Sequence, residues 1–263
     1  MRPDSAARQM SSGARRARPS NHDSPISPSI RRAYVPPRPE QVHLLTAEQL
    51  LHGTRPIVAA SQQLDLAEIA LQAPLWCVGD LSLIERRSVA IVGARHVTTE
   101  GAARARRLAR ELSEANVTVV SGLAKGVDTA ALTAAVDAGG KVIAVVGTPV
   151  DRAYPAENKA LQEQIYRDHL LVSQFAPGVR VFPRHFPQRN RLMALLTDAS
   201  VIVEAGETSG TLHQATECVR LGRWLFIARS VVDDSALTWP ARFTHYPNVR
   251  VLAHTQDLLG VLR

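Results

Sequence analysis

Residues 88–95 read SVAIVGAR and residues 117–128 read VTVVSGLAKGVD, and in both stretches an apolar run ends shortly before or at a glycine. The runs are short, rich in valine and nearly free of polar residues. This pattern is typical of strands that are buried on both faces, as in parallel sheets. A glycine after such a strand lets backbone N–H groups approach a ligand, while Arg95 and Lys125 add positive charge. The two stretches therefore predict strands that end in loops suited to an anion.

From residue 88 onward, short apolar runs of this kind alternate with helical patterns. Further runs lie at Val142–Val146, Leu170–Val172, Val201–Val203, Trp224–Ile227 and, as a possible edge, Val249–Leu252. One helix is indicated by Asp128–Ala138, which stops at two glycines, and another by apolar residues at i, i+3, i+4 and i+7 spacing, namely Ala105, Leu108, Ala109 and Leu112. Alternating strands and helices predict an α/β fold with a doubly wound, mostly parallel sheet, in which ligands bind at the carboxyl ends of the strands.

The charge of the chain is unevenly distributed. The 263 residues carry a formal net charge of +7, and residues 1–40 hold eight arginines, three acidic residues, seven serines and seven prolines. We expect this stretch to be a disordered basic tail, either simply solvated or in nonspecific contact with a polyanion. Residues 41–87 are expected to be a short helical lead-in, and residues 88–263 the α/β domain.

Composition excludes several classes of protein. No stretch approaches 18 apolar residues, and the first residues lack the apolar run of a signal peptide, so we expect a cytoplasmic protein without a membrane span. Cys77 and Cys218 stand far apart and outside any Cys-x-x-Cys pair, and the nine histidines show no metal-ligand spacing. Buried free thiols and no bound metal are therefore expected. Aromatic residues make up only 5% of the chain, so a nucleic-acid site would depend on charge and backbone more than on stacking.

Three predicted loops at strand ends carry the candidate anion-binding residues. These are Gly93 and Arg95 in the first loop, Ser121, Gly122, Lys125 and Gly126 in the second, and Ser209, Gly210 and Thr211 in the third. Arginine can bind a phosphate through two parallel hydrogen bonds, and the start of a helix presents free N–H groups to an anion. In the second loop, Asp128 is placed to cap the following helix. Each loop also has a purely structural interpretation, as a turn or a helix cap.

A fourth candidate is the stretch FPQRNR at residues 186–191, which leads into an apolar helix. Arg189 and Arg191 are two residues apart, so their side chains point about 200° apart on a helix. We expect one of them to face the ligand cleft and the other to form a structural ion pair. Asn190, between them, adds an amide to the candidate site.

Together these motifs resemble the DNA-processing protein A (DprA/Smf) family, over about residues 74–223. The matching motifs follow one another in the family's order: PLWCVG at 74–79, VAIVGAR at 89–95, SGLAKGVD at 121–128, GKVIAVVG at 140–147, Tyr154-Pro155 with Asn158, Phe186-Pro187 with Arg189–Arg191, Glu204-Ala205, Ser209-Gly210 and Gly222-Arg223. Each motif alone is weakly specific, whereas the ordered series is specific.

The resemblance implies a Rossmann-like domain that binds single-stranded DNA, usually as a homodimer, and that is no enzyme and needs no cofactor. It implies a role in DNA uptake and natural transformation, including the loading of RecA recombinase. By position, Arg95, Lys125, Arg189 and Arg191 would line a basic pocket. The backbone donors around it would come from Gly93, Gly122, Ser209 and Gly210.

The sequence also departs from the family pattern, and two other functions stay open. Ala156 stands where a basic residue commonly follows the Tyr-Pro pair, Gln174 replaces a glutamate, and residues 228–230 lack the expected Pro-Gly. One alternative is a nucleotide-sensing module of defence or signalling, whose loops would hold a single nucleotide. The other is a phosphoribohydrolase, but Gln214 occupies the position of its acid, and Glu217 lies one turn further on.

Overall fold

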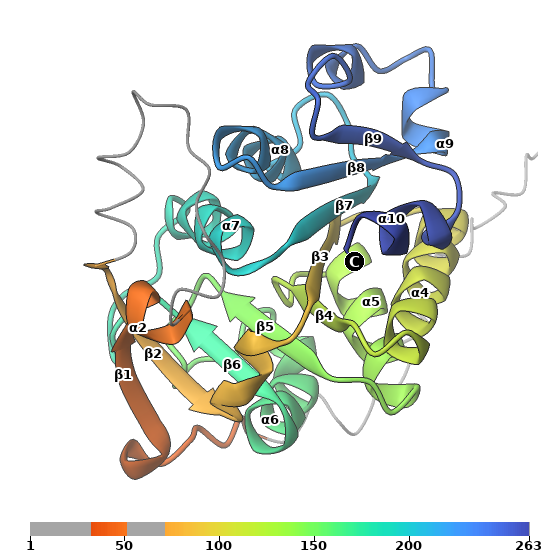
Figure 1. Ribbon diagram of the computed structural model, residues 1–263. Coiled ribbons are helices and arrows are strands. Elements are labelled where there is room, and N and C mark those ends of the chain that lie inside the picture. Colours follow the sequence, from red (N-terminus) through yellow and green to blue (C-terminus); the bar gives the residue numbers. More distant parts are fainter. Residues whose placement is uncertain (1–32, 52–71, 263) are drawn as a thin grey trace, which may run out of the picture.

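A computed structural model describes residues 33–51 and 72–262 of the chain. Within them, nine strands form one sheet in the order β1-β2-β6-β5-β4-β3-β7-β8-β9 (Figure 1). The strands are β1 (Val42–Thr46), β2 (Pro74–Gly79), β3 (Ser88–Gly93), β4 (Thr118–Ser121), β5 (Val142–Val146), β6 (Leu170–Ser173), β7 (Ala199–Glu204), β8 (Trp224–Ala228) and β9 (Val249–Leu252). Among these strands, β2 runs antiparallel to both neighbours, β1 and β6, and the pairs from β6 to β9 are all parallel.

Helices connect the strands and cover both faces of the sheet. The α-helices are α2 (Ala47–Leu51), α4 (Thr99–Glu114), α5 (Val127–Asp137), α6 (Lys159–Asp168), α7 (His185–Leu196), α8 (Thr211–Arg220), α9 (Arg229–Val232) and α10 (Thr255–Val261). Short 3-10 helices are η1 (Pro39–Gln41), η2 (Leu81–Glu85), η3 (Ala156–Asn158) and η4 (Trp239–Arg242). This confirms the expected Rossmann-like α/β fold and every strand predicted from residue 88 onward.

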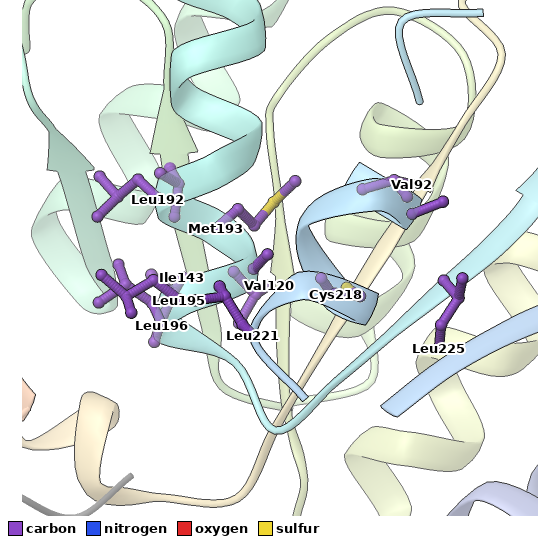
Figure 2. Close-up of a cluster of buried hydrophobic side chains, with 14 of the residues drawn as sticks. Val92, Val120, Ile143, Leu192, Met193, Leu195, Leu196, Cys218, Leu221 and Leu225 are labelled. Carbon is purple, nitrogen blue, oxygen red and sulfur yellow. The ribbon is translucent and has the colours of Figure 1, made fainter. Parts of the chain in front are cut away.

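The uninterrupted apolar runs form strands because neighbouring residues on each strand enter two different cores. On β3, Val89 and Ile91 belong to the core that includes residues of α4, α5, α6 and α10, whereas Ala90 and Val92 belong to the core that includes residues of α2, α7, α8 and α9. Figure 2 shows part of the second core, in which Met193 of α7 and Cys218 of α8 approach the strands. A strand that is covered on both faces needs apolar residues at every position, as this sequence provides.

The order of strands in the sheet positions a crevice. From β3 the chain proceeds through β4, β5 and β6 in one direction across the sheet, and then β7, β8 and β9 follow on the other side of β3. The connections after β3 and β7 consequently leave neighbouring strands toward opposite faces (Figure 1). Such a switch point opens a ligand crevice at the carboxyl ends of the two strands.

The helical lead-in expected for residues 41–87 is wrong in part. Residues 47–51 do form α2, but β1 and β2 extend the parallel sheet by two strands at its β6 edge. The helical pattern expected over residues 52–71 lies outside the described residues. The sequence pattern did not predict these strands, because β1 has no regular alternation of buried and exposed positions and β2 begins at a proline.

The expectation of a disordered tail concerned residues 1–40, of which 1–32 lie outside the described residues. Within residues 33–38, Tyr34 and Val35 are hydrogen-bonded to α6 and to the loop after β5. The Tyr34 hydroxyl donates a hydrogen bond to the Val150 carbonyl (2.8 Å), and the Tyr166 hydroxyl donates one to the Val35 carbonyl (2.9 Å). Tail residues 33–38 therefore belong to the folded domain, which corrects the expected boundary.

Candidate nucleic-acid interface

A cavity of about 660 Å³ opens at the switch point between β3 and β7. Its walls come from the loop after β3, the loop after β7, and the first turns of α7 and α8, with Tyr154 at the rim. Its charged lining residues are Arg95, Arg189 and Asp128, and His96 and His213 add two imidazoles. The cavity is therefore predominantly basic and open to an anionic ligand.

The loop after β3 turns sharply at Gly93 and directs Arg95 outward. A Cβ atom at Gly93 would stand 2.6 Å from Val127 Cγ2 and 2.8 Å from the Glu204 carbonyl oxygen, so only glycine fits. The exposed guanidinium of Arg95 lies over the Phe186 ring, 5.2 Å from its centroid. Among the described residues it has no acidic partner, which leaves its charge available for a ligand.

Glu204, at the end of β7, is oriented toward the neighbouring helix start. Its carboxylate accepts hydrogen bonds from the Thr98 backbone N–H (2.9 Å) and the Thr98 hydroxyl (2.5 Å). The Thr98 hydroxyl oxygen in turn caps α4 by accepting from the Gly101 N–H (3.0 Å). Glu204 thus holds the start of α4 and does not line the cavity.

Arg189 is almost completely buried, with 5% of its surface exposed. Its guanidinium donates hydrogen bonds to the carbonyls of Gly122 and Val145 (2.9 Å for the latter), at the ends of β4 and β5. Burial lowers the pKa of Arg189, but an arginine remains protonated in proteins. A fixed positive charge therefore lies at the floor of the cavity. It is close enough to Arg95 for the two positive charges to repel each other.

Asp128 balances this charge and closes the second loop, although it does not cap the helix as we expected. The N-cap of α5 is Gly126, whose φ of +82° suits glycine. One oxygen of Asp128 accepts hydrogen bonds from the N–H groups of Gly122 (3.1 Å) and Ala124 (3.3 Å). Burial raises the pKa of the Asp128 carboxyl, while Arg189 and these two donors act in the opposite direction.

The third loop is fixed to α7 through Asn190. The Arg189 Nε donates to Asn190 Oδ1 (2.8 Å), and Asn190 Nδ2 donates to the Gly210 carbonyl (3.2 Å). The Ser209 hydroxyl donates to Thr211 Oγ1 (2.9 Å), which donates to the Gly93 carbonyl (3.3 Å). These bonds hold the N-terminus of α8 at the cavity, where the positive end of the helix dipole favours an anion. The N–H groups of Thr211, Leu212 and His213 already donate to Ser209 and Gly210.

The part of the chain that forms this cavity matches a known protein family. The family model of DNA recombination-mediator protein A matches residues 61–245, which contain the whole cavity. The chain belongs to this family. A curated relative, the DNA processing protein DprA of Streptococcus pneumoniae, is 42% identical over 172 residues, covering 64% of this chain and 60% of that protein. The chain spans about half the length of the curated relatives it matches.

Two solved structures of recombination-mediator A proteins are similar in fold. The X-ray structure of DprA from S. pneumoniae has a TM-score of 0.69 at 34% identity and covers 84% of this chain and 74% of that chain. DprA from Helicobacter pylori has a TM-score of 0.64 at 26% identity, covering 72% and 86%. The description of the latter structure concerns its single-stranded DNA binding mode.

Seven of the candidate residues predicted from the sequence line the main cavity: Gly93, Arg95, Arg189, Asn190, Ser209, Gly210 and Thr211. An adjoining cavity of about 60 Å³, which shares Arg95 and Arg189, is lined by Gly122 and Lys125. The Lys125 ammonium, however, forms an ion pair with Glu157 (2.6 Å). Lys125 therefore contributes less net charge than its sequence position predicted.

Three other predicted residues do not line either cavity. Arg191 points away and pairs with Glu217 (3.0 Å), as the 200° separation from Arg189 allowed. The Ser121 hydroxyl is buried and donates to the Ile91 carbonyl (2.6 Å). A Cβ atom at Gly126 would overlap the Ala94 carbonyl oxygen, so this glycine serves the packing of the first two loops.

Sequence reasoning missed the aromatic component of the site. Tyr154 and Phe186 line both cavities, and their ring centroids are 5.6 Å apart. A Cβ atom at Gly147 would stand 2.8 Å from Phe186 Cδ1, so a glycine follows β5 where the ring lies. The two prolines that follow these aromatics, in Tyr-Pro and Phe-Pro, were the available signal.

The described residues contain no group of three or more side chains that could hold a metal ion. Cys77 and Cys218 are buried free thiols, as expected, and burial raises the pKa of each to about 12. A thiol with such a pKa is a poor nucleophile. No helix in the described part of the chain is both long and apolar enough to cross a membrane.

Proposed function

We propose that this chain binds single-stranded DNA in the cavity between β3 and β7 and acts on DNA taken up by the cell, without catalysing a reaction. The observation that carries the proposal is the pair Arg95 and Arg189, two guanidinium groups in one cavity that has a single acidic lining residue, Asp128. Mutual repulsion between them is relieved by a bound phosphate. Contacts of this kind hold a strand without reading its sequence.

The aromatic pair favours nucleic acid over a simple anion. Tyr154 is 50% exposed at the rim, and Phe186 lies beneath Arg95 inside the cavity. Bases stack on such rings whatever their identity, and each stacked base contributes about 1–3 kcal/mol. Phosphate contacts to Arg95 and to the N-terminus of α8 would then alternate with stacked bases. The family description and the H. pylori structure support the same ligand.

A hydrolytic function is disfavoured by the residues at the expected acid position. Gln214 is fully buried and donates a hydrogen bond to the Ser200 hydroxyl (2.8 Å), away from the cavity. Glu217 is held by Arg191 and Arg220 in ion pairs of 3.0 and 2.7 Å. Neither side chain lines the cavity as a base for attack on a nucleotide.

The test measures fluorescence anisotropy of labelled oligothymidylates, from the mononucleotide to a ~20-mer that exceeds one site of about 4–16 nucleotides. We expect affinity to rise with strand length, to weaken as salt rises, and to fall at least tenfold in Arg95→Ala. The control is Arg106→Ala, which removes an exposed arginine from α4. Equal affinity for the mononucleotide and the ~20-mer would contradict the proposal and favour the nucleotide-sensing alternative.

The finer parts of the proposal are dimerisation, delivery of the strand to RecA recombinase, and action in the cytoplasm. Of these, the contact with a recombinase is supported by the family's description as a recombination mediator. Light scattering of the full chain, with and without a bound strand, tests the homodimer. Co-sedimentation of purified RecA with the DNA-bound chain, compared with DNA alone, tests the recombinase contact.

A further inference from the structure

A second basic and aromatic surface lies beside the main cavity, on the loop that joins β6 to α7. Residues 174–184 of this loop read QFAPGVRVFPR and contain two arginines and no acidic residue. A cavity of about 470 Å³ on this loop is lined by Arg152, Arg180 and Phe182, among others. It shares Tyr154, Pro183 and Phe186 with the main cavity, so the two are contiguous.

The charges on this surface are not neutralised by the fold. Arg152, Arg180 and Arg184 are exposed, and none of them forms an ion pair with an acidic side chain of the described residues. The nearby Asp151 accepts a hydrogen bond from the Gly178 N–H (2.8 Å) at the tip of the loop. Its carboxylate therefore serves the loop's own geometry.

The loop is built around an aromatic stack that holds the arginines in place. The His185 ring stacks on Phe175 at 3.8 Å and meets Phe182 edge-on at 5.5 Å. The guanidinium carbons of Arg184 and Arg180 lie 4.5 and 5.6 Å from the centroid of the Phe182 ring. At the start of the loop, the Phe175 N–H donates to the Ser173 hydroxyl oxygen (3.1 Å). Two guanidinium groups around one ring form a preorganised site for a phosphate beside a base.

From this arrangement we infer that the loop 174–184 is a second binding subsite for the same strand. The single-stranded DNA leaves the main cavity over the Tyr154–Phe186 pair and places its next phosphates against Arg180 and Arg184, with a base on Phe182. This inference rests on the proposed function, because the subsite extends a strand that the main cavity already holds. A surface of alternating guanidinium groups and rings matches the alternation of phosphates and bases.

The test compares a short strand with a longer one, using labelled oligothymidylates of ~4 nucleotides, enough for the main cavity, and ~12 nucleotides, enough for both sites. For the full chain carrying Arg180→Ala and Arg184→Ala, we expect the affinity for the ~12-mer to fall about tenfold at ~0.1 M salt. The slope of log affinity against log salt should flatten by about 1.4, since each phosphate contact contributes about 0.7. Affinity for the ~4-mer should stay within about twofold of the wild type.

A matched control removes the same charge elsewhere. Arg106 and Arg110 are exposed on α4, which covers the sheet in a different place from α7 (Figure 1). The double variant Arg106→Ala and Arg110→Ala should bind both strands like the wild type. Phe182→Leu, which keeps an apolar side chain and all the charges but removes the ring, should weaken binding of the ~12-mer and flatten its salt slope less than the double arginine variant does. Thermal unfolding of each variant shows whether the fold is retained.

The outcomes separate this inference from the function on which it rests. If the wild type binds the ~12-mer no more tightly than the ~4-mer, or if the loop variant binds the ~12-mer like the wild type, the subsite is refuted while the main cavity stands. If the wild type binds neither strand, the proposed function itself fails. If the α4 control loses as much affinity as the loop variant, the effect is one of net charge and the subsite is likewise refuted.

Discussion

The backbone of Gly122 lies directly against the guanidinium group of Arg189, and a Cβ atom at position 122 would overlap Nη1 of that group. The two residues come from different elements, since Gly122 follows β4 and Arg189 lies on α7. The arginine also donates a hydrogen bond to the Gly122 carbonyl. This contact joins the second loop to the floor of the cavity, so the site depends on a glycine that does not touch the main cavity.

Substitution of Gly122 by alanine should therefore destabilise the protein. The added methyl group must displace a buried charge or move the loop, and overpacking of this kind costs about 1–3 kcal/mol. Urea unfolding of Gly122→Ala would measure the loss in the free energy of unfolding. Gly260→Ala is the control, because a Cβ atom at Gly260 on α10 would have no neighbouring atom within 4 Å, and alanine favours helix. Equal stability of Gly122→Ala and the wild type would contradict the close packing of Gly122 against Arg189.

Anchoring of residues 33–38 should contribute measurably to stability. The Tyr34 hydroxyl donates to the Val150 carbonyl (2.8 Å) and accepts from Gln162 Nε2 (3.0 Å), so Tyr34→Phe removes two partly buried hydrogen bonds. We expect a loss of about 1–2 kcal/mol in the free energy of unfolding. Tyr154→Phe, at an exposed hydroxyl with no hydrogen bond in the described residues, should change stability by less than about 0.5 kcal/mol. If both variants unfold alike, the anchoring contributes nothing.

His185 should make the protein less stable in mild acid. Burial and the neighbouring Arg184 lower the pKa of the His185 imidazole below its usual 6.5, although a hydrogen bond to Gly147 opposes them. Below pH 6.5 the unfolded chain therefore binds this proton more readily than the folded chain. Stability falls as pH drops from 6.5 toward the lowered pKa, by at most about 1.4 kcal/mol per pH unit.

The variant His185→Gln isolates this effect from that of His169, whose pKa burial also lowers. Unfolding in urea at several pH values between 7 and 5 would give the free energy of unfolding of both proteins. The difference between wild type and variant should shift against the wild type as the pH falls. A constant difference over this range would show that His185 does not titrate differently in the folded chain.

Much of the fold follows from the sequence because parallel strands that are buried on both faces require uninterrupted apolar runs. Val142–Val146 was expected as a strand and is β5 without a change of boundary. β1 departs from this pattern because it pairs antiparallel at one side of the sheet and exposes Leu44 (62% exposed), whereas β2 has a short apolar run that begins at a proline. A strand with partly exposed faces has no such run, so its pattern resembles a helix or a loop.

The candidate site was predictable where a residue's role depends on its own strand and loop. Gly93, Arg95 and the Ser209–Thr211 turn lie at the switch point because their strands end there. Lys125 and Arg191 differ, because the acids that neutralise them, Glu157 and Glu217, come from other elements. Sequence spacing says nothing of such partners. Phe186 was not predicted as a site residue for a related reason, since its position under Arg95 depends on how α7 packs.

The stacked pair of Arg95 and Phe186 allows charge and stacking to be measured separately. Arg95→Ala removes a phosphate contact and should flatten the salt slope of strand binding by about 0.7. Phe186→Leu removes a stacking surface but no charge, so it should weaken binding by about 1–3 kcal/mol, roughly 5- to 150-fold, with the salt slope unchanged. Anisotropy titrations of a ~12-mer at four salt concentrations give both quantities. Because the ring also packs against Gly147, thermal unfolding must first show that Phe186→Leu is folded. A flattened slope in the folded Phe186→Leu variant would mean that the ring acts only by positioning Arg95, and that no base stacks on it.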